Sequence, residues 1–192
     1  MSDYKLAEII GEGNFRVCYA VTGRPDICVK RIKPGLRFLR RMHLFLFRSG
    51  MNREEYKTYQ RLPEALKPYF NPVIDAGKNY LVTGRPMDFD GSHSRPVCAY
   101  GKISNDAFWK KMEKIISLFE HHNIWFFDAF QKGNNVFVQR ISEHEWQPII
   151  VDYKRIGWKS YPVQVNLLVD SEKKKKFYRK YTRFINHFRA LK

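Results

Sequence analysis

The segment GNNVFVQRISEHEWQPIIVD, at positions 133–152, restricts the fold of this chain more than any other. Its two apolar runs are typical of strands joined by a turn, with Asn135 before the first strand and Asp152 at the end of the second. Because the open ends of an antiparallel hairpin lie together, these two residues are predicted to be neighbours. Amide and carboxylate oxygens suit Mg²⁺, so the pattern predicts a metal site at Asn135 and Asp152. The alternatives are a turn preference for Asn, which is our interpretation of Asn134, and a strand terminator or helix cap for Asp.

The first 32 residues predict a three-stranded antiparallel meander. Strands are expected at residues 4–10, 16–21 and 27–32. The loop GEGN between the first two strands contains Gly11 and Gly13. Glycine has no Cβ, so the backbone N–H groups of such a loop can approach phosphate oxygens closely. An ordinary hairpin turn is the alternative interpretation of this glycine pair.

A lysine and a glutamate form the second candidate pair. Lys30 lies in the third predicted strand, between apolar neighbours. Residues 52–62 are predicted to form a helix, with Asn52 as its N-cap. Glu55 shares a helix face with inward-pointing residues and is the candidate partner of Lys30. Glu54, one residue earlier, is expected to be a surface carboxylate near the helix N-terminus.

The remaining elements are two strands, a helix, the hairpin described above and a final helix. Residues 71–77 and 78–86 read as the two strands, and the helix that follows begins at Ser104 or Asn105. Apolar residues recur at helical spacing in this helix, at Phe108, Met112, Ile115, Ile116 and Phe119. The C-terminal basic helix carries a similar stripe, at Phe177, Tyr181, Phe184 and Phe188.

This order of elements is that of a protein-kinase-like fold. We therefore expect an α+β chain, 1–192, that forms a single small two-lobed kinase-like domain. The N-lobe, about 1–87, is an antiparallel β-sheet, and the C-lobe, 88–192, is reduced, mainly helical and ends in the basic helix. In kinases the strand lysine binds ATP phosphates and is held by the helix glutamate, while Asn and Asp bind Mg²⁺. The order thus assigns phosphate binding to Lys30 and metal binding to Asn135 and Asp152.

The chain departs from the kinase pattern at four positions. The catalytic Asp stands five residues before the metal-binding Asn in kinases, and here that residue is Phe130. Asp128 is two residues too early: either a longer loop lets it act as the base, or it is a cap. Arg16 stands at the third glycine, and Tyr153-Lys154 replaces Phe-Gly after the metal-binding Asp. Lys132 and Gly133 fit a loop that approaches phosphate.

Several segments resemble the bacterial YrbL family, proteins of the PhoP regulatory network with a kinase-like fold. They are GEGNFRVCYA, CVKRI, EEYKTYQRL, MDFDG and, above all, QRISEHEWQPIIVD. The resemblance covers about residues 6–160 and leaves out the C-terminal basic helix. It implies an ATP-binding fold related in architecture to small bacterial sugar and lipopolysaccharide kinases, and it implies no particular substrate.

Charge and composition limit the partners and the compartment. A net charge of +16 favours polyanionic partners such as a nucleotide, a phosphorylated glycan or lipid, or an anionic membrane face. Three cysteines without a C-x-x-C pair indicate reduced thiols. Neither a signal peptide nor an apolar run of about 20 residues is found, so we expect a cytoplasmic protein. The insert 33–50 mixes arginines with large apolar residues, which fits either contact with the inner membrane face or packing on the lobe.

Three functions remain open. The first is ATP- and Mg²⁺-dependent phosphotransfer to a small-molecule or glycan acceptor, for example a phosphorylated lipopolysaccharide core sugar. The reduced C-lobe argues against protein substrates. The second is a pseudokinase, an inactive nucleotide-binding or regulatory scaffold, favoured by Phe130, Arg16 and Lys154. The third is binding of nucleic acid or an anionic membrane through the basic surface, although the chain lacks a recognised nucleic-acid motif.

Overall fold

The computed structural model describes two compact units. Unit 1 comprises Met1–Arg61 and Pro72–Arg85, and unit 2 comprises Leu62–Asn71 and Pro86–Lys192. Within these units the structure describes residues 4–39, 41–42, 45, 50–126, 129–130, 132–153 and 170–190.

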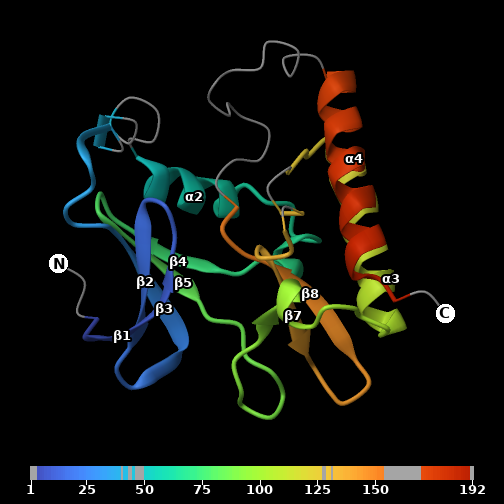
Figure 1. The fold of residues 1–192 in the computed structure, drawn as a ribbon, viewed down its shortest axis with the longest axis horizontal. Coiled ribbons are helices and arrows are strands. Elements are labelled where there is room, and N and C mark those ends of the chain that lie inside the picture. Colours follow the sequence, from blue (N-terminus) through green and yellow to red (C-terminus); the bar gives the residue numbers. More distant parts are fainter. Residues whose placement is uncertain are drawn as a thin grey trace. The chain divides into compact units, whose positions relative to one another are not determined.

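Unit 1 is built on a five-stranded antiparallel sheet with the order β1-β2-β3-β5-β4 (Figure 1). The strands are β1 (Leu6–Glu12), β2 (Arg16–Val21), β3 (Arg24–Ile32), β4 (Val73–Ala76) and β5 (Tyr80–Gly84). The predicted meander is confirmed, although β1 continues through Gly11 to Glu12.

Alternation along β3 separates the two faces of this sheet. Ile27 and Val29 are buried with Val82 of β5 in an apolar cluster, and Val29 pairs directly with Val82. Cys28 and Lys30 alternate with these two residues along β3 and therefore point to the opposite face. The period of two thus places the candidate phosphate-binding lysine on the face away from the cluster.

Helix α2 (Met51–Gln60) follows the insert in unit 1 and contacts β4 and β5. Its N-cap is Gly50, with φ 80°, a conformation that glycine adopts without steric cost. The prediction of Asn52 as the N-cap was wrong. Asn52 lies inside the first helical turn and is buried, together with Met51 and Glu55.

Unit 2 contains two long helices, α3 (Asp106–His121) and α4 (Asp170–Phe188) (Figure 1). The Asn105 side chain caps α3 by accepting from the Phe108 amide at 2.9 Å, as predicted. Trp109 of α3 packs on Phe184, and Phe119 packs on Phe177. Because the order of contacts is reversed along α4, the two helices are antiparallel. Both predicted apolar stripes are buried.

The other elements of unit 2 form a small sheet and two short turns of helix. The sheet has the order β6-β7-β8, with β6 (Arg95–Pro96), β7 (Val136–Arg140) and β8 (Trp146–Ile150). The 3-10 helices are η1 (Lys67–Tyr69) and η2 (Val97–Ala99). Strands β7 and β8 form the predicted antiparallel hairpin. Among the described residues, no helix has the length and apolar character needed to cross a membrane.

Candidate functional site

The lysine and glutamate predicted to pair lie together in unit 1. Lys30 is in the middle of β3, opposite Cys18 of β2 and Leu81 of β5. Its Nζ is 3.3 Å from Oε1 of Glu55 on α2. The Glu55 side chain is only 1% exposed and that of Lys30 14%, whereas Glu54 is exposed. Lys30 and Glu55 are 25 residues apart in sequence, and burying such an ion pair costs desolvation energy. Its presence therefore favours a functional role for the two residues.

Arg16, the first residue of β2, is a second cation on Glu55. Its Nη2 lies 2.7 Å from Glu55 Oε2, and its Nη1 donates to Asn52 Oδ1 at 3.2 Å. The side chain is 6% exposed. Glu55 Oε2 makes no well-directed hydrogen bond, so its contact with Arg16 is an ion pair. The sequence pattern marked Arg16 only as a departure from a glycine and gave no sign of this role.

The fold itself does not demand glycine at positions 11 and 13. Gly11 lies opposite Cys18, and the Gly13 amide donates to the Arg16 carbonyl oxygen at 2.8 Å. A Cβ at Gly11 or Gly13 would meet its nearest atom at 3.7 or 3.6 Å, an ordinary contact, and neither residue has a positive φ. The absent side chains therefore leave room above the backbone, as close approach of a ligand requires.

Two thiols share the sheet face of Lys30. Cys18 lies opposite Lys30, and Cys28 is two residues before Lys30 on β3. The pKa of the buried Cys28 thiol is lowered, chiefly by its interaction with the neighbouring Cys18 thiol. Burial opposes this shift, while Thr83 Oγ1, at 3.2 Å, and the charge of Lys30 reinforce it. The pKa of the Cys28 thiol is therefore sensitive to the charge of Lys30.

The two predicted metal ligands lie at adjacent strand ends in unit 2. Val136 pairs with Ile150, and one step further the Val151 amide donates to the Asn135 carbonyl oxygen at 2.9 Å. Asp152 follows immediately. Asn135 and Asp152 are both half-buried, and their amide and carboxylate oxygens fit the donor preference of Mg²⁺. The described residues contain no group of three His, Cys, Asp or Glu side chains that could bind a metal.

The backbone around Asp152 is held in an unusual conformation. Asp152 has φ 56°, in the left-handed region that costs an L-residue about 1 kcal/mol or more. The next residue, Tyr153, is 1% exposed. Its hydroxyl donates to the Asn71 carbonyl oxygen at 2.5 Å, and its ring packs edge-on against Phe70, with centroids 4.9 Å apart. Tyr153 is thus anchored in the core of unit 2 by both its ring and its hydroxyl. Lys154 lies outside the described residues.

The loop before Asn135 differs from a kinase catalytic loop. Phe130, at the position of the kinase base, is buried among α4 rings, with centroids 5.1 to 5.5 Å from those of Phe177, Tyr181 and Phe184. Asp128, the candidate base, lies outside the described residues. Gly133 has φ 68°, and a Cβ there would approach Phe188 to 2.6 Å, so packing on α4 explains this glycine.

The neighbouring Asn134 also has a local partner. Its Oδ1 accepts a hydrogen bond from the Cys98 thiol at 2.9 Å. Asn134 is exposed, whereas Asn135 is half-buried at the end of the hairpin. The two asparagines therefore occupy different environments, and Asn135 is the one whose backbone pairs with Val151, the residue before Asp152.

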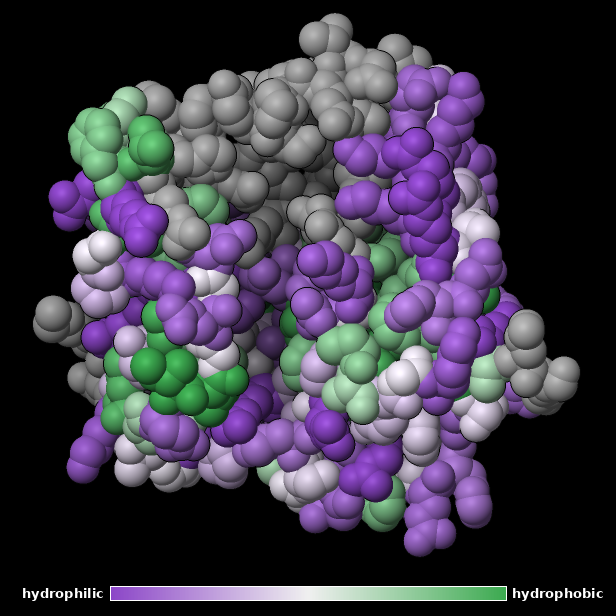
Figure 2. All heavy atoms as spheres, viewed as in Figure 1, coloured by the Kyte–Doolittle hydropathy of each residue, from purple (hydrophilic) through white to green (hydrophobic). Residues whose placement is uncertain are grey.

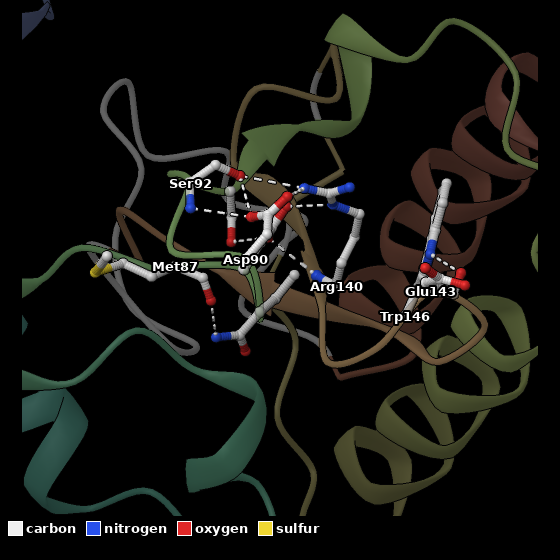
Figure 3. A network of polar contacts seen from close by, with 9 residues as sticks. Met87, Asp90, Ser92, Arg140, Glu143 and Trp146 are labelled. Atoms are coloured by element: carbon white, nitrogen blue, oxygen red, sulfur yellow. Dashed lines mark hydrogen bonds and ion pairs between the residues drawn. The ribbon is translucent and has the colours of Figure 1, made fainter.

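A second arginine network, in unit 2, was not anticipated from the sequence. Arg140 of β7 contacts the loop of residues 87–94, in which Asp88 and Asp90 are its acidic partners (Figure 3). Asp88 Oδ2 accepts from Arg140 Nε at 2.5 Å, and Asp88 Oδ1 accepts from Ser94 Oγ at 2.6 Å. The pair of aspartates in MDFDG was the available sequence signal, but its partner lies about 50 residues away.

The described part of the insert exposes large apolar side chains. Phe38, Leu39 and Phe45 are 72%, 79% and 76% exposed. Arg37 and Arg41, between and beside them, are also exposed. A group of hydrophobic side chains is visible in Figure 2 where Figure 1 draws this segment. Phe38, Leu39 and Phe45 therefore do not pack on the lobe, whereas Leu44, Leu46 and Phe47 of the insert lie outside the described residues.

Comparison with known proteins shows the fold and no family. The chain matches no protein-family model, and a search of curated proteins gives no match. Its structure is similar to that of the Rio2 kinase from Chaetomium thermophilum, with a TM-score of 0.64 and 13% sequence identity. The match covers 98% of this chain and 59% of the Rio2 kinase chain. The chain therefore has a protein-kinase-like α+β fold, with an antiparallel sheet followed by a small helical part, and the YrbL similarity remains a resemblance.

Proposed function

We propose that this protein binds ATP with Mg²⁺ and transfers the terminal phosphoryl group to a small-molecule or glycan acceptor. The observation that carries the proposal is the buried ion pair between Lys30 and Glu55, 3.3 Å apart, in a chain with a kinase-like fold. In kinases this pair and the Asn and Asp ligands act on one nucleotide. The adjacent positions of Asn135 and Asp152 support the same division of roles here.

Each residue has a chemical role in this proposal. Lys30 binds the ATP phosphates and Glu55 orients Lys30, while the backbone of the glycine loop donates to phosphate oxygens. Asn135 and Asp152 hold Mg²⁺, which neutralises charge on the phosphates. The acceptor hydroxyl forms a bond to the γ-phosphorus, the bond to the ADP oxygen breaks, and Asp128 is the proposed recipient of the hydroxyl proton.

The acceptor is proposed to be anionic. The net charge of +16 favours substrates that already carry phosphate. A phosphorylated glycan or lipid, such as a lipopolysaccharide core sugar, meets this requirement. The resemblance to the YrbL family agrees with such a substrate class but does not specify the acceptor.

A pseudokinase is the rival proposal. It is favoured by the buried Phe130 at the position of the kinase base. Phosphoryl transfer depends mostly on positioning and charge stabilisation, so a displaced base is compatible with activity. A pseudokinase can still bind ATP, and only turnover separates the two proposals.

Nucleotide binding is tested by thermal unfolding with ATP, with and without Mg²⁺, on the wild type, Lys30→Met and Asp152→Asn. The proposal predicts a rise in Tm that requires Mg²⁺ and that both substitutions reduce or abolish. Asp26→Asn is the matched control, because this exposed aspartate on β3 pairs with Arg24. Absence of any ATP-dependent shift in the wild type contradicts both the kinase and the nucleotide-binding pseudokinase proposals.

Turnover is tested next, by measuring ADP release with phosphorylated lipopolysaccharide core oligosaccharide as the acceptor. Release above the rate with water alone, lost in Asp128→Asn, supports the transferase with Asp128 as the base. Release that persists in Asp128→Asn supports a transferase without that base. ATP binding with no release across a panel of sugars favours the pseudokinase.

We also propose peripheral contact of the insert with an anionic membrane surface. Exposed Phe38 and Phe45 beside Arg37 and Arg41 combine apolar insertion with attraction to acidic headgroups. The wild type is expected to co-sediment with phosphatidylglycerol vesicles, and the double variant Phe38→Ser/Phe45→Ser is expected to stay in the supernatant. Ile9→Ser, on exposed β1, is the control. Equal sedimentation of all variants, or equal binding to neutral phosphatidylcholine vesicles, contradicts the proposal.

A further inference from the structure

The buried Arg16 connects the start of β2 with helix α2 at two points. Its Nη2 lies 2.7 Å from Glu55 Oε2, and its Nη1 donates to Asn52 Oδ1 at 3.2 Å. Asn52 and Glu55 are three residues apart and therefore lie on one face of α2. A guanidinium presents its donors in a rigid plane, so rotation or translation of α2 disturbs both contacts.

Asn52 extends this connection to a third segment of the same unit. Its amide nitrogen donates to the Lys78 carbonyl oxygen, in the turn between β4 and β5, at 3.3 Å. The first turn of α2 is thus connected to β2 through Arg16 and to the β4–β5 turn through Asn52. The side chain that sequence analysis assigned to helix capping is instead part of this buried polar network.

Arg16 and Lys30 contact different oxygens of the same carboxylate. Arg16 approaches Oε2 at 2.7 Å, and Lys30 approaches Oε1 at 3.3 Å. The contact with Arg16 therefore orients the Glu55 carboxylate with its other oxygen toward Lys30. Since Gly13 donates to the Arg16 carbonyl oxygen, the same residue also joins the glycine loop to this network.

We infer that Arg16 is a positioning residue, which holds Glu55 and α2 in the arrangement that presents Lys30 to the nucleotide phosphates. This inference rests on the proposed ATP-binding function. The kinase pattern has a glycine at position 16. In this chain the arginine at that position connects α2 to strand β2 of the sheet. The Lys30–Glu55 ion pair is then assembled in the free protein, without a preceding movement of α2.

Hydrogen–deuterium exchange of the nucleotide-free protein tests the positioning role directly. In Arg16→Gln, amides of residues 51–60 are expected to exchange at least about tenfold faster, as loss of a charge-assisted hydrogen bond implies. Amides of the β7–β8 hairpin in unit 2 should be unchanged. Labelling of Lys30 by an amine-reactive reagent, measured by mass spectrometry, should also change in rate. A purely global loss of stability raises exchange in both units alike, which overturns the inference.

Two further variants complete the test. Arg31→Gln removes the same charge from an exposed position on β3 and should leave α2 exchange and Lys30 labelling as in the wild type. Arg16→Lys keeps the charge but has one nitrogen for two partners, so it should recover stability without recovering the protection of α2. This variant also serves if Arg16→Gln does not fold.

Nucleotide affinity separates the inference from the proposed function. With wild-type binding established, Arg16→Gln is expected to weaken ATP binding about tenfold or more, while Arg31→Gln does not. If the wild type fails to bind ATP, the proposed function is wrong, and loosened α2 still supports the role of Arg16 in placing Glu55. If α2 exchange and Lys30 labelling are unchanged in Arg16→Gln and Arg16→Lys, the inference is wrong whatever the ATP affinity.

Discussion

The Arg16–Glu55 network of unit 1 and the Arg140–Asp88–Asp90 network of unit 2 differ in how completely their carboxylates are bonded. In unit 2, both oxygens of Asp88 and both oxygens of Asp90 accept hydrogen bonds from Arg140 or from serines of the same loop (Figure 3). In unit 1, among the described residues, Glu55 accepts one hydrogen bond, from Lys30, and its other oxygen is in an ion pair with Arg16 without a well-directed hydrogen bond. Glu55 is nevertheless the more deeply buried of these groups.

This difference separates a structural network from a candidate functional one. A buried carboxylate with all its hydrogen bonds made fixes a loop at little net cost, as Asp88 does with residues 87–94. A buried carboxylate shared by two cations with incomplete hydrogen bonding is costly. A buried polar group that lacks a hydrogen bond calls for an explanation, and a role in binding a ligand is one such explanation. Substitutions in the unit 1 network are therefore expected to change the response to nucleotide, whereas substitutions in the Asp88–Asp90 network should change stability alone.

The largest effect is expected for Glu55→Gln. The substitution leaves two buried cations, Arg16 and Lys30, without their shared counter-charge, which should lower the free energy of unfolding by about 3–5 kcal/mol. It should also reduce the ATP-dependent rise in Tm, since Lys30 loses its orienting partner. Chemical denaturation and thermal shift measure the two effects. A stable Glu55→Gln variant that keeps the full ATP response contradicts the functional interpretation of the unit 1 network.

Asp88→Asn should be less severe and should leave the nucleotide response intact. An amide at this position loses the charge-assisted bond to Arg140 Nε and cannot accept all three donors equally well. We expect the free energy of unfolding to fall by about 2–3 kcal/mol. The ATP-dependent change in Tm, measured relative to the variant's own Tm, should equal that of the wild type. A lost ATP response in a folded variant would show that this network, too, serves the site.

The thiol of Cys28 provides a smaller and more local test. Its pKa is lowered, with the neighbouring Cys18 thiol as the main cause and the Lys30 charge as a contributor. Because removal of a nearby cation disfavours the thiolate, Lys30→Met should raise this pKa and slow alkylation at pH 7 severalfold. Mass spectrometry after iodoacetamide treatment measures the rate, with the exposed Cys98 as an internal control. An unchanged pH profile excludes electrostatic contact between Lys30 and the thiols.

The smallest effect is expected at Asp90 and at acid pH. Hydrogen bonds from Ser92, reinforced by Arg140, lower the pKa of Asp90 to about 2 from an ordinary 3.8. A lowered pKa in the folded state means that the ionised form adds stability above about pH 4, and that this contribution is lost as the pH falls toward 2. Asp90→Asn should therefore flatten the pH dependence of unfolding in that window alone. An identical acid profile for wild type and variant contradicts the assignment.

Much of the fold followed from local sequence patterns. The alternation of strands β1 to β3, the Asn105 cap and the apolar stripes of α3 and α4 all appear in the structure as predicted, because period and capping chemistry act over a few residues. Asn135 and Asp152 lie at the same end of the hairpin for the same reason: a short hairpin fixes the register of its two ends, here with Asn135 opposite Val151. The role of these residues as metal ligands remains a proposal.

The sequence by itself thus determined the elements, their order and the residues at the ends of one hairpin. Only the tertiary structure decided that Arg16 shares Glu55 with Lys30, that Asn52 lies in the same buried network rather than capping α2, and that Arg140 binds the loop of residues 87–94. The physical reason is separation along the chain. Arg16 and Asn52 are 36 residues apart, and Arg140 and Asp88 are 52 apart. No local period or spacing encodes which distant charges meet, since sheet register and helix docking set those pairs.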